Sequence, residues 1–93
     1  MTILTAADIV GANAKVALGT AGQTARRIFI TATGSANARF GDTNVGAARG
    51  AALPNGTPVQ LTASDSDLTA SFDLSQTFVY VPTGTTISYT WAV

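Results

Sequence analysis

The sequence predicts an all-β fold, an antiparallel β-sandwich of about seven to eight short strands, for which a jelly roll is one candidate topology. Three observations lead to this prediction. Apolar and polar side chains alternate in several segments, and β-branched and aromatic residues concentrate in the same segments. Turn signals built from Gly, Pro, Asn and Ser recur roughly every 8–12 residues. The 93 residues are expected to form one domain, 1–93.

The first part of the chain is the least regular. Thr2–Thr5 is expected to be a first strand or an extended arm, and residues 1–13 together are a candidate N-terminal arm. Ala6–Ala14 fits either a helical turn or a loop, because Gly11 disfavours a long helix. Ala14–Leu18 is predicted as a strand with Lys15 outward. Its apolar side chains are expected to point inward: Ala14, Val16 and Leu18.

The most informative stretch runs from Ala25 to Gly50. Ala25–Thr33 is rich in β-branched and aromatic residues, Gly34-Ser35 is a turn signal, and Ala36–Gly41 alternates. By period and by turn chemistry this is a two-strand hairpin. A Gly-punctuated loop follows at Gly41–Gly50, and Asp42–Leu53 has no sustained period. The large apolar anchors of this region are expected to be Val45 and Leu53.

The second half carries the clearest strand patterns. Pro54-Asn55-Gly56 is the strongest turn signal, and Pro58–Ala63 alternates after it. Thr77–Val81 is apolar on both faces, which predicts a central strand or one covered by a partner. In the last strand one face is expected to be core: Ile87, Tyr89, Trp91 and Val93. Because successive side chains alternate between faces, this pattern strongly specifies the register.

The composition favours a protein that packs against other molecules. Charged residues make up 11% of the chain, against roughly 25% in an ordinary soluble domain, and the net charge is zero. Ala, Thr and Gly fill positions that Lys and Glu usually occupy. The alternative is that Thr and Ser side chains solubilise a monomer. We expect assembly with copies of itself or with a scaffold, because charge-poor neutral surfaces promote association.

Residue types exclude most catalytic chemistry. His and Cys are absent and every acid is an Asp, so nucleophilic triads and thiolate metal sites are ruled out. Asp65 and Asp67 are interpreted as a polar turn rather than a calcium loop. Gly41–Gly50 lacks the GK[ST] ending of a phosphate cradle. We therefore expect a protein that is not an enzyme and that has no cofactor or metal site.

Two groups of residues remain open to more than one interpretation. Arg39, Asp42 and Arg49 could form an ion pair that fixes the Gly41–Gly50 loop. Tyr89 and Trp91 could stack on sugars, although their position on the face of Ile87 and Val93 favours the core. The sequence contains no Lys/Arg run and no long apolar segment, and because its first residues lack a basic region we expect no signal peptide. We expect no nucleic-acid or membrane partner, and synthesis in the cytoplasm.

Over its last two-thirds the sequence resembles small virion proteins of tailed bacteriophages. The segments are ARRIFITATG, NARFGDTNVGAARGAALPNGTPVQLT and FVYVPTGTTISYTWAV. They match short patterns of the kind R-x-I-x-I, V-R-x-G-D-x-N-V, R-G-x-x-L-x-x-G and P-V-x-L. The matching positions are Arg27, Ile28, Ile30, Arg39, Gly41, Asp42, Asn44, Val45, Arg49, Gly50, Leu53, Gly56, Val59, Leu61, Tyr80, Gly84, Ser88 and Thr90.

This resemblance implies a capsid decoration (cement) protein. Such a protein would sit on the outer face of a phage head as a homotrimer, bind the major capsid protein and stabilise the mature lattice. The alternatives are a neck or tail-associated virion module, and a carbohydrate-binding module that uses Tyr80, Tyr89 or Trp91. The candidate capsid and subunit interface comprises Thr2, Ile3, Leu4, Ile9, Arg39, Asp42, Asn44 and Arg49.

Overall fold

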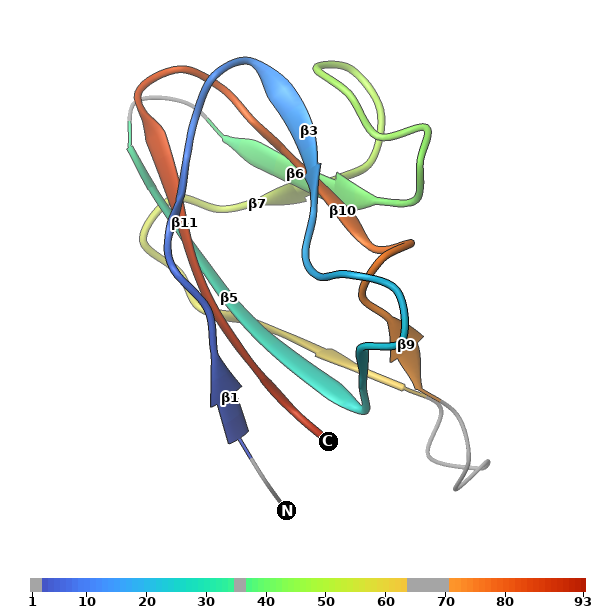
Figure 1. Ribbon diagram of the computed structural model, residues 1–93. Helices are drawn as coiled ribbons and strands as arrows, with labels where there is room; N and C mark the ends of the chain where they lie inside the picture. The colour runs from blue at the N-terminus through green and yellow to red at the C-terminus, as the bar shows by residue number, and fades with distance from the viewer. Residues whose placement is uncertain (1–2, 35–36, 64–70) are drawn as a thin grey trace.

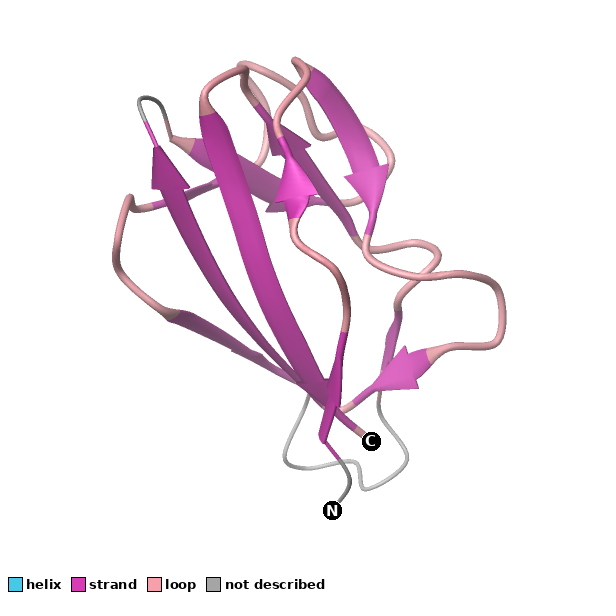
Figure 2. Ribbon diagram, turned by 60° about the vertical axis from the view of Figure 1, so that its left-hand side comes forward, coloured by secondary structure: helices cyan, strands magenta, loops and turns pink. Residues whose placement is uncertain are grey.

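The computed structural model describes residues 3–34, 37–63 and 71–93. In these ranges the chain forms eleven β-strands and no helix, which confirms the predicted all-β class (Figures 1 and 2). Eight strands are at least three residues long. The strands are β1 (Ile3–Thr5), β2 (Ile9–Val10), β3 (Ala14–Ala17), β4 (Thr24–Ala25), β5 (Arg27–Gly34), β6 (Ala38–Gly41), β7 (Ala51–Leu53), β8 (Val59–Thr62), β9 (Phe72–Asp73), β10 (Phe78–Val81) and β11 (Thr85–Ala92).

The strands form two large antiparallel sheets and one small one. The first sheet has the order β1-β11-β5-β8, with β2 also paired to β11. The second has the order β3-β10-β6-β7, and β4 pairs with β9 alone. Counting the eight longer strands, the first pairs with the last, the second with the seventh, the third with the sixth and the fourth with the fifth. This nested pairing is the jelly-roll arrangement of a β-sandwich.

The predicted hairpin between Ala25–Thr33 and Ala36–Gly41 is wrong. Both segments are strands, but β5 pairs with β11 and β8 in the first sheet, whereas β6 pairs with β10 and β7 in the second. A period of two and a turn signal identify two consecutive strands. They do not show whether the second strand returns beside the first or crosses to the opposite sheet. The long-range partners of β5 decide this.

The hydrophobic core lies between the two sheets. The predicted inward face of the last strand is confirmed for Ile87, Tyr89 and Trp91, whose exposed fractions are 0%, 8% and 6%. Val93 differs from the prediction: it is 49% exposed, because it lies beyond Ala92, where β11 and its pairing with β5 and β1 end. The other fully buried large side chains come from five further segments and include Leu18, Ile28, Ile30, Leu53, Leu74, Val79 and Val81.

The interpretation of Thr77–Val81 as a central strand is confirmed. β10 lies between β3 and β6, with Val79 and Val81 in the core.

The expectation for the strand predicted at Ala14–Leu18 is wrong in part. In β3, Ala14 and Val16 are exposed, although Leu18 just beyond it is buried. The reason is that β3 is an edge strand of the second sheet, so little of the chain covers its middle.

Two glycines mark points where the backbone needs glycine. Gly56 has a φ of +73° in the predicted Pro54 turn, which Thr57 closes by donating its N–H to the Pro54 carbonyl at 3.4 Å. Gly34, at the end of β5, has a φ of +151° and lies against the backbone of Gly84. A side chain there would meet the Gly84 carbonyl oxygen at 2.2 Å. Only glycine has free access to such positive φ values.

Trp91→Ala should lower the free energy of unfolding by about 3–5 kcal/mol, because it removes a large buried side chain and leaves a cavity. Val93→Ala is the control, since Val93 is two residues after Trp91 and half exposed. It should change stability by less than about 0.5 kcal/mol. Denaturant unfolding followed by circular dichroism measures both, since Trp91→Ala removes the only tryptophan of the chain. A Trp91→Ala loss below 1 kcal/mol would contradict its place in the core.

Gly34→Ala should destabilise the domain by about 1–3 kcal/mol, because the methyl group meets backbone atoms and the φ is unfavourable for alanine. Gly46→Ala is a matched control, since a Cβ at Gly46 has no neighbour within 4 Å. Thermal unfolding of the two variants tests the difference. Equal melting temperatures would show that the close approach of β5 to the β10–β11 turn does not constrain the fold.

Candidate functional site

The predicted interface residues lie on two separate surfaces. Ile3 and Leu4 are in β1 and Ile9 is in β2, along one edge of the first sheet. The remaining four belong to β6 of the second sheet and to the loop after it: Arg39, Asp42, Asn44 and Arg49. Figure 1 shows β1 at the lower end of the molecule and this loop at the upper end. Thr2 lies outside the described residues, as do Asp65 and Asp67.

We call residues Ile3–Val10 the N-terminal edge. Of the two alternatives for the first segment, Ile3–Thr5 is a strand: β1 pairs with β11, from Ile3 opposite Ala92 to Thr5 opposite Thr90. β2 continues along the same side of β11. β1 and β2 therefore belong to the first sheet. Of the alternatives considered for Ala6–Ala14, the loop holds for residues 6–8 and 11–13, which lie outside any strand, whereas Ile9–Val10 is a short strand and no helical turn forms.

The N-terminal edge is unusually apolar for a surface. Ile3 is 61% exposed, Leu4 40% and Val10 75%. Val93, which follows the β11 residue opposite Ile3, is 49% exposed. Among the described residues these are four of the five exposed large hydrophobic side chains, and Val16 is the fifth. Ile3, Leu4 and Val93 lie near the C-terminal end of β11, whereas Val10 lies opposite Thr86 at its other end. Exposed apolar side chains along one sheet edge favour an interaction site there.

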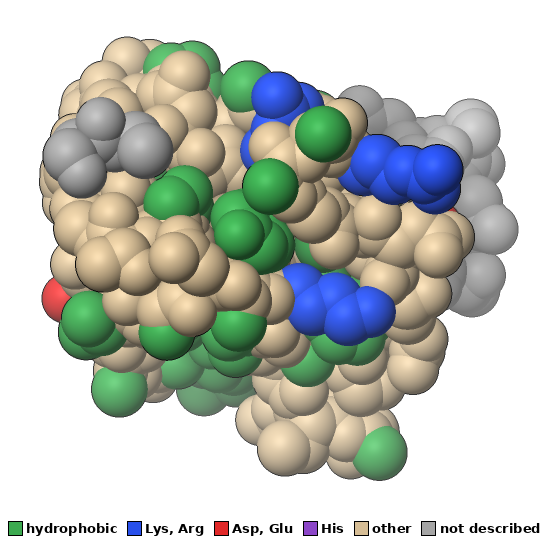
Figure 3. Space-filling view, turned by 90° about the horizontal axis from the view of Figure 1, so that it is seen from above, with side chains coloured by type: hydrophobic (Ala, Val, Ile, Leu, Met, Phe, Trp, Pro, Cys, Tyr) green, Lys and Arg blue, Asp and Glu red, His purple; other side chains and the backbone are tan. Residues whose placement is uncertain are grey.

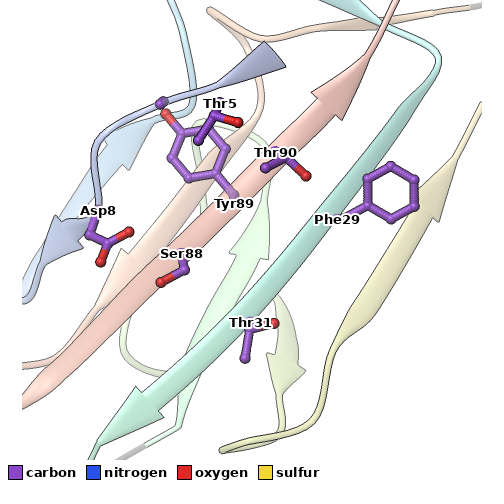
Figure 4. A pocket seen from close by; sticks show the side chains of 8 residues that line it. Thr5, Asp8, Phe29, Thr31, Ser88, Tyr89 and Thr90 are labelled. Atoms are coloured by element: carbon purple, nitrogen blue, oxygen red, sulfur yellow. The ribbon is translucent and has the colours of Figure 1, made fainter. Parts of the chain in front are cut away.

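A β-bulge interrupts this edge and leaves a hollow beside it. Thr5 is opposite Thr90 and Ile9 is opposite Ile87, so three residues of the edge face two residues of β11. The adjoining hollow has a volume of about 250 Å³. In Figure 4 Ser88 on β11 and Thr31 on β5 lie between Asp8 and Phe29. The lining residues are Thr5, Ala6, Asp8, Phe29, Thr31, Ser88, Tyr89 and Thr90.

We call residues Asp42–Gly50 the 42–50 loop. The Asp42 carboxylate accepts a hydrogen bond from the Asn44 N–H at 2.9 Å, and the Asp42 carbonyl accepts one from the Val45 N–H at 3.1 Å. The Val45 side chain is 6% exposed, so it anchors the loop as predicted. Arg39 donates from Nη1 to the Gly50 carbonyl at 2.8 Å and holds the end of the loop against β6.

The expected ion pair is not present in the part of the chain that the structure describes. Arg39 and Asp42 each bind backbone groups, and neither Arg39 nor Arg49 pairs with the Asp42 carboxylate. The physical reason is local. A carboxylate that accepts from the N–H two residues ahead forms an Asx turn, which folds the side chain back onto its own loop. Backbone hydrogen bonds therefore fix the 42–50 loop.

Sequence reasoning missed a contact between β3 and this loop. Lys15 donates a hydrogen bond from Nζ to the Thr43 carbonyl, and its Nζ lies 5.5 Å from the centre of the Phe78 ring. Lys15 and Arg39 flank Tyr80 from the two neighbouring strands. Figure 3 shows basic side chains around apolar ones on this side of the molecule. The alternation of Ala14–Leu18 indicated only that Lys15 points outward.

The aromatic residues of the last strand belong to the core. The rings of Tyr89 and Trp91 stack at 5.8 Å, and the Tyr89 hydroxyl donates to the Leu18 carbonyl at 2.7 Å. Burial raises the pKa of the Tyr89 hydroxyl above its ordinary value. The interpretation of both residues as core is confirmed, since their exposed fractions are only 8% and 6%. Tyr80 remains half-buried on the outer face of the second sheet.

Residues 3–34, 37–63 and 71–93 contain no group of three or more His, Cys, Asp or Glu side chains placed to bind a metal ion. The same part of the chain has no helix that is long and apolar enough to cross a membrane.

Tyr89→Phe should lower stability by about 1–3 kcal/mol near neutral pH, because the buried Leu18 carbonyl loses its donor. Above pH 10 the wild-type protein should also lose stability as pH rises. The folded state holds the Tyr89 proton longer than the unfolded state does, so deprotonation favours unfolding. The Tyr89→Phe variant should lack the part of this high-pH loss of stability that comes from Tyr89. Denaturant melts between pH 7 and 11 measure it, with Tyr80→Phe as control. Parallel pH curves for wild type and Tyr89→Phe would contradict the assignment.

Comparison of the chain with protein-family models, with curated proteins and with solved structures finds no match.

Proposed function

We propose that this chain is a decoration protein of a tailed-phage head, which binds the outer surface of the capsid and stabilises the mature lattice. The observation that carries the proposal is the apolar N-terminal edge, with Ile3 61% and Val10 75% exposed on a chain whose charged fraction is only 11%. Such a surface is stabilised when another protein covers it, since burying apolar area contributes about 25 cal/mol per Å².

Two separate contact surfaces fit the task of holding neighbouring subunits together. The N-terminal edge is apolar, whereas the 42–50 loop offers the polar side chains of Asn44 and Arg49. The sandwich between them keeps the two surfaces at a fixed separation, because its strands are joined by continuous antiparallel ladders. One surface then serves contacts between copies and the other contacts the major capsid protein.

The mechanism is binding linkage. A protein that binds the mature lattice and not the disassembled subunits stabilises the lattice by mass action. Each individual contact need only be weak, because many copies bind one particle and their stabilising free energies add up. The residues of the 42–50 loop suit such a role. Arg49 is exposed, and covering its charge with a complementary group of the shell would set the docking position.

The bulge favours a second candidate function, binding of a neutral sugar. Hydroxyl groups of Thr31, Ser88 and Thr90 and the carboxylate of Asp8 line the hollow, and Phe29 supplies an apolar surface. Polar groups beside an aromatic ring are the elements that small-ligand sites combine. Glycan arrays test this candidate, and Asp8→Ala should abolish any binding that occurs in the hollow.

Mass spectrometry of purified virions tests the proposed function through copy number. A decoration protein should be present in hundreds of copies per particle, because it repeats over the lattice. A dozen copies or fewer would favour the neck or tail-associated alternative instead. Absence from finished particles would refute both.

Arg49→Ala should weaken binding of the purified protein to undecorated heads at least tenfold, which corresponds to about 1.4 kcal/mol. The reason is that a shell group paired with Arg49 would be left without its partner. Co-sedimentation with heads measures the change. Arg27→Ala, on the outer face of the first sheet, is the matched control and should bind like wild type. Equal binding of both variants would exclude the 42–50 loop as the shell contact.

A further inference from the structure

We propose that β1 binds a second copy of this chain. In this arrangement the β1 strands of two molecules pair antiparallel about a two-fold axis at Leu4, so that their first sheets become one continuous sheet. The proposal concerns self-association of the protein in solution. It does not depend on head decoration and is tested separately.

A comparison of the sheet edges points to β1. The two large sheets have four edges, and three of them carry a feature that discourages pairing. β3 presents the exposed Lys15, β7 runs into Pro54, and β8 begins directly after Pro58. Charged residues and prolines protect natural edges, because an open strand otherwise recruits another chain. β1 has neither, and its side chains include Ile3 and Leu4.

The hydrogen bonds of β11 show which backbone groups of β1 are open. In an antiparallel sheet each residue directs its N–H and C=O to one neighbouring strand, and successive residues alternate. The Thr85 carbonyl accepts from the Gly11 N–H at 2.8 Å, so Thr85 faces the N-terminal edge. Every second residue after Thr85, including Trp91, also directs its backbone N–H and C=O toward the N-terminal edge. Because Leu4 is opposite Trp91, the backbone groups of these two residues form hydrogen bonds with each other.

The residues on either side of Leu4 therefore direct their backbone groups away from β11. Ile3 and Thr5 offer N–H and C=O groups to the open side of the sheet. In a two-fold pair, Thr5 of each molecule donates to the Ile3 carbonyl of the other. The two Leu4 residues then form a non-hydrogen-bonded pair, with Cα atoms about 4.5 Å apart.

The side chains of the edge suit the same arrangement. The two Leu4 side chains, each 40% exposed, meet on the core side of the sheet, and Ile3 of one molecule lies beside Thr5 of the other on the outer side. A two-fold contact uses the same patch twice, so an apolar patch is complementary to itself. Like-charge repulsion does not oppose it, since β1 is uncharged and the net charge of the chain is zero.

Cysteine cross-linking tests the register, because the chain contains no native cysteine. Leu4→Cys places two thiols within disulfide distance across the two-fold axis. Val16→Cys is the matched control: Val16 is 38% exposed on the β3 edge, against 40% for Leu4. In a glutathione redox buffer, Leu4→Cys should form the covalent dimer at least tenfold faster than Val16→Cys. Equal rates would overturn the proposal.

Thr5→Pro provides a second test that does not use cysteine. It removes the Thr5 N–H, which faces the open side, and an edge strand tolerates proline at such a position. Size-exclusion chromatography with light scattering should show wild type approaching twice the monomer mass of 9.4 kDa as concentration rises. The variant should remain monomeric with an unchanged melting temperature. A wild-type monomer at about 1 mM, or a trimer, would overturn the two-fold pairing.

Discussion

The pairing of β11 with β5 is the constraint on which the rest of the structure depends. Eight consecutive residue pairs join the two strands, from Thr85 opposite Gly34 to Ala92 opposite Arg27. On the inner face this ladder buries Ile28, Ile30, Ile87 and Trp91, and a slip of one residue would turn every one of them toward solvent. The register of the central ladder is therefore set by the free energy of apolar burial.

The surfaces of the molecule follow from this ladder. β11 has β5 on one side, so its other side is left for β1 and β2, which are short and interrupted by a bulge. The hollow lies beside this interruption, and the uncharged strand β1 forms the open edge of the first sheet. The 42–50 loop lies on the second sheet, where Arg39 and Lys15 bind backbone carbonyls of the loop. A compact sandwich thus presents an apolar edge and a polar loop that do not overlap.

The candidate site was predictable only in part. The low charged fraction and the absence of His, Cys and Glu predict binding rather than catalysis. The predicted contact residues that the structure describes are Ile3, Leu4, Ile9, Arg39, Asp42, Asn44 and Arg49. Their division into two surfaces depends on which sheet each strand joins. The contact of Lys15 with Phe78 and with the 42–50 loop joins segments far apart in the chain, so no local pattern reveals it.

By itself the sequence determined the all-β class, the positions of most longer strands and the inward face of Ile87, Tyr89 and Trp91, because alternation and turn chemistry are local properties of the chain. Tertiary structure alone decided that β5 and β6 belong to opposite sheets, that Val16 and Val93 are exposed, and that Asp42 binds its own loop. Those features depend on which distant strand covers each residue. Pairing between distant strands is a property of the whole fold, and a period of two does not encode it.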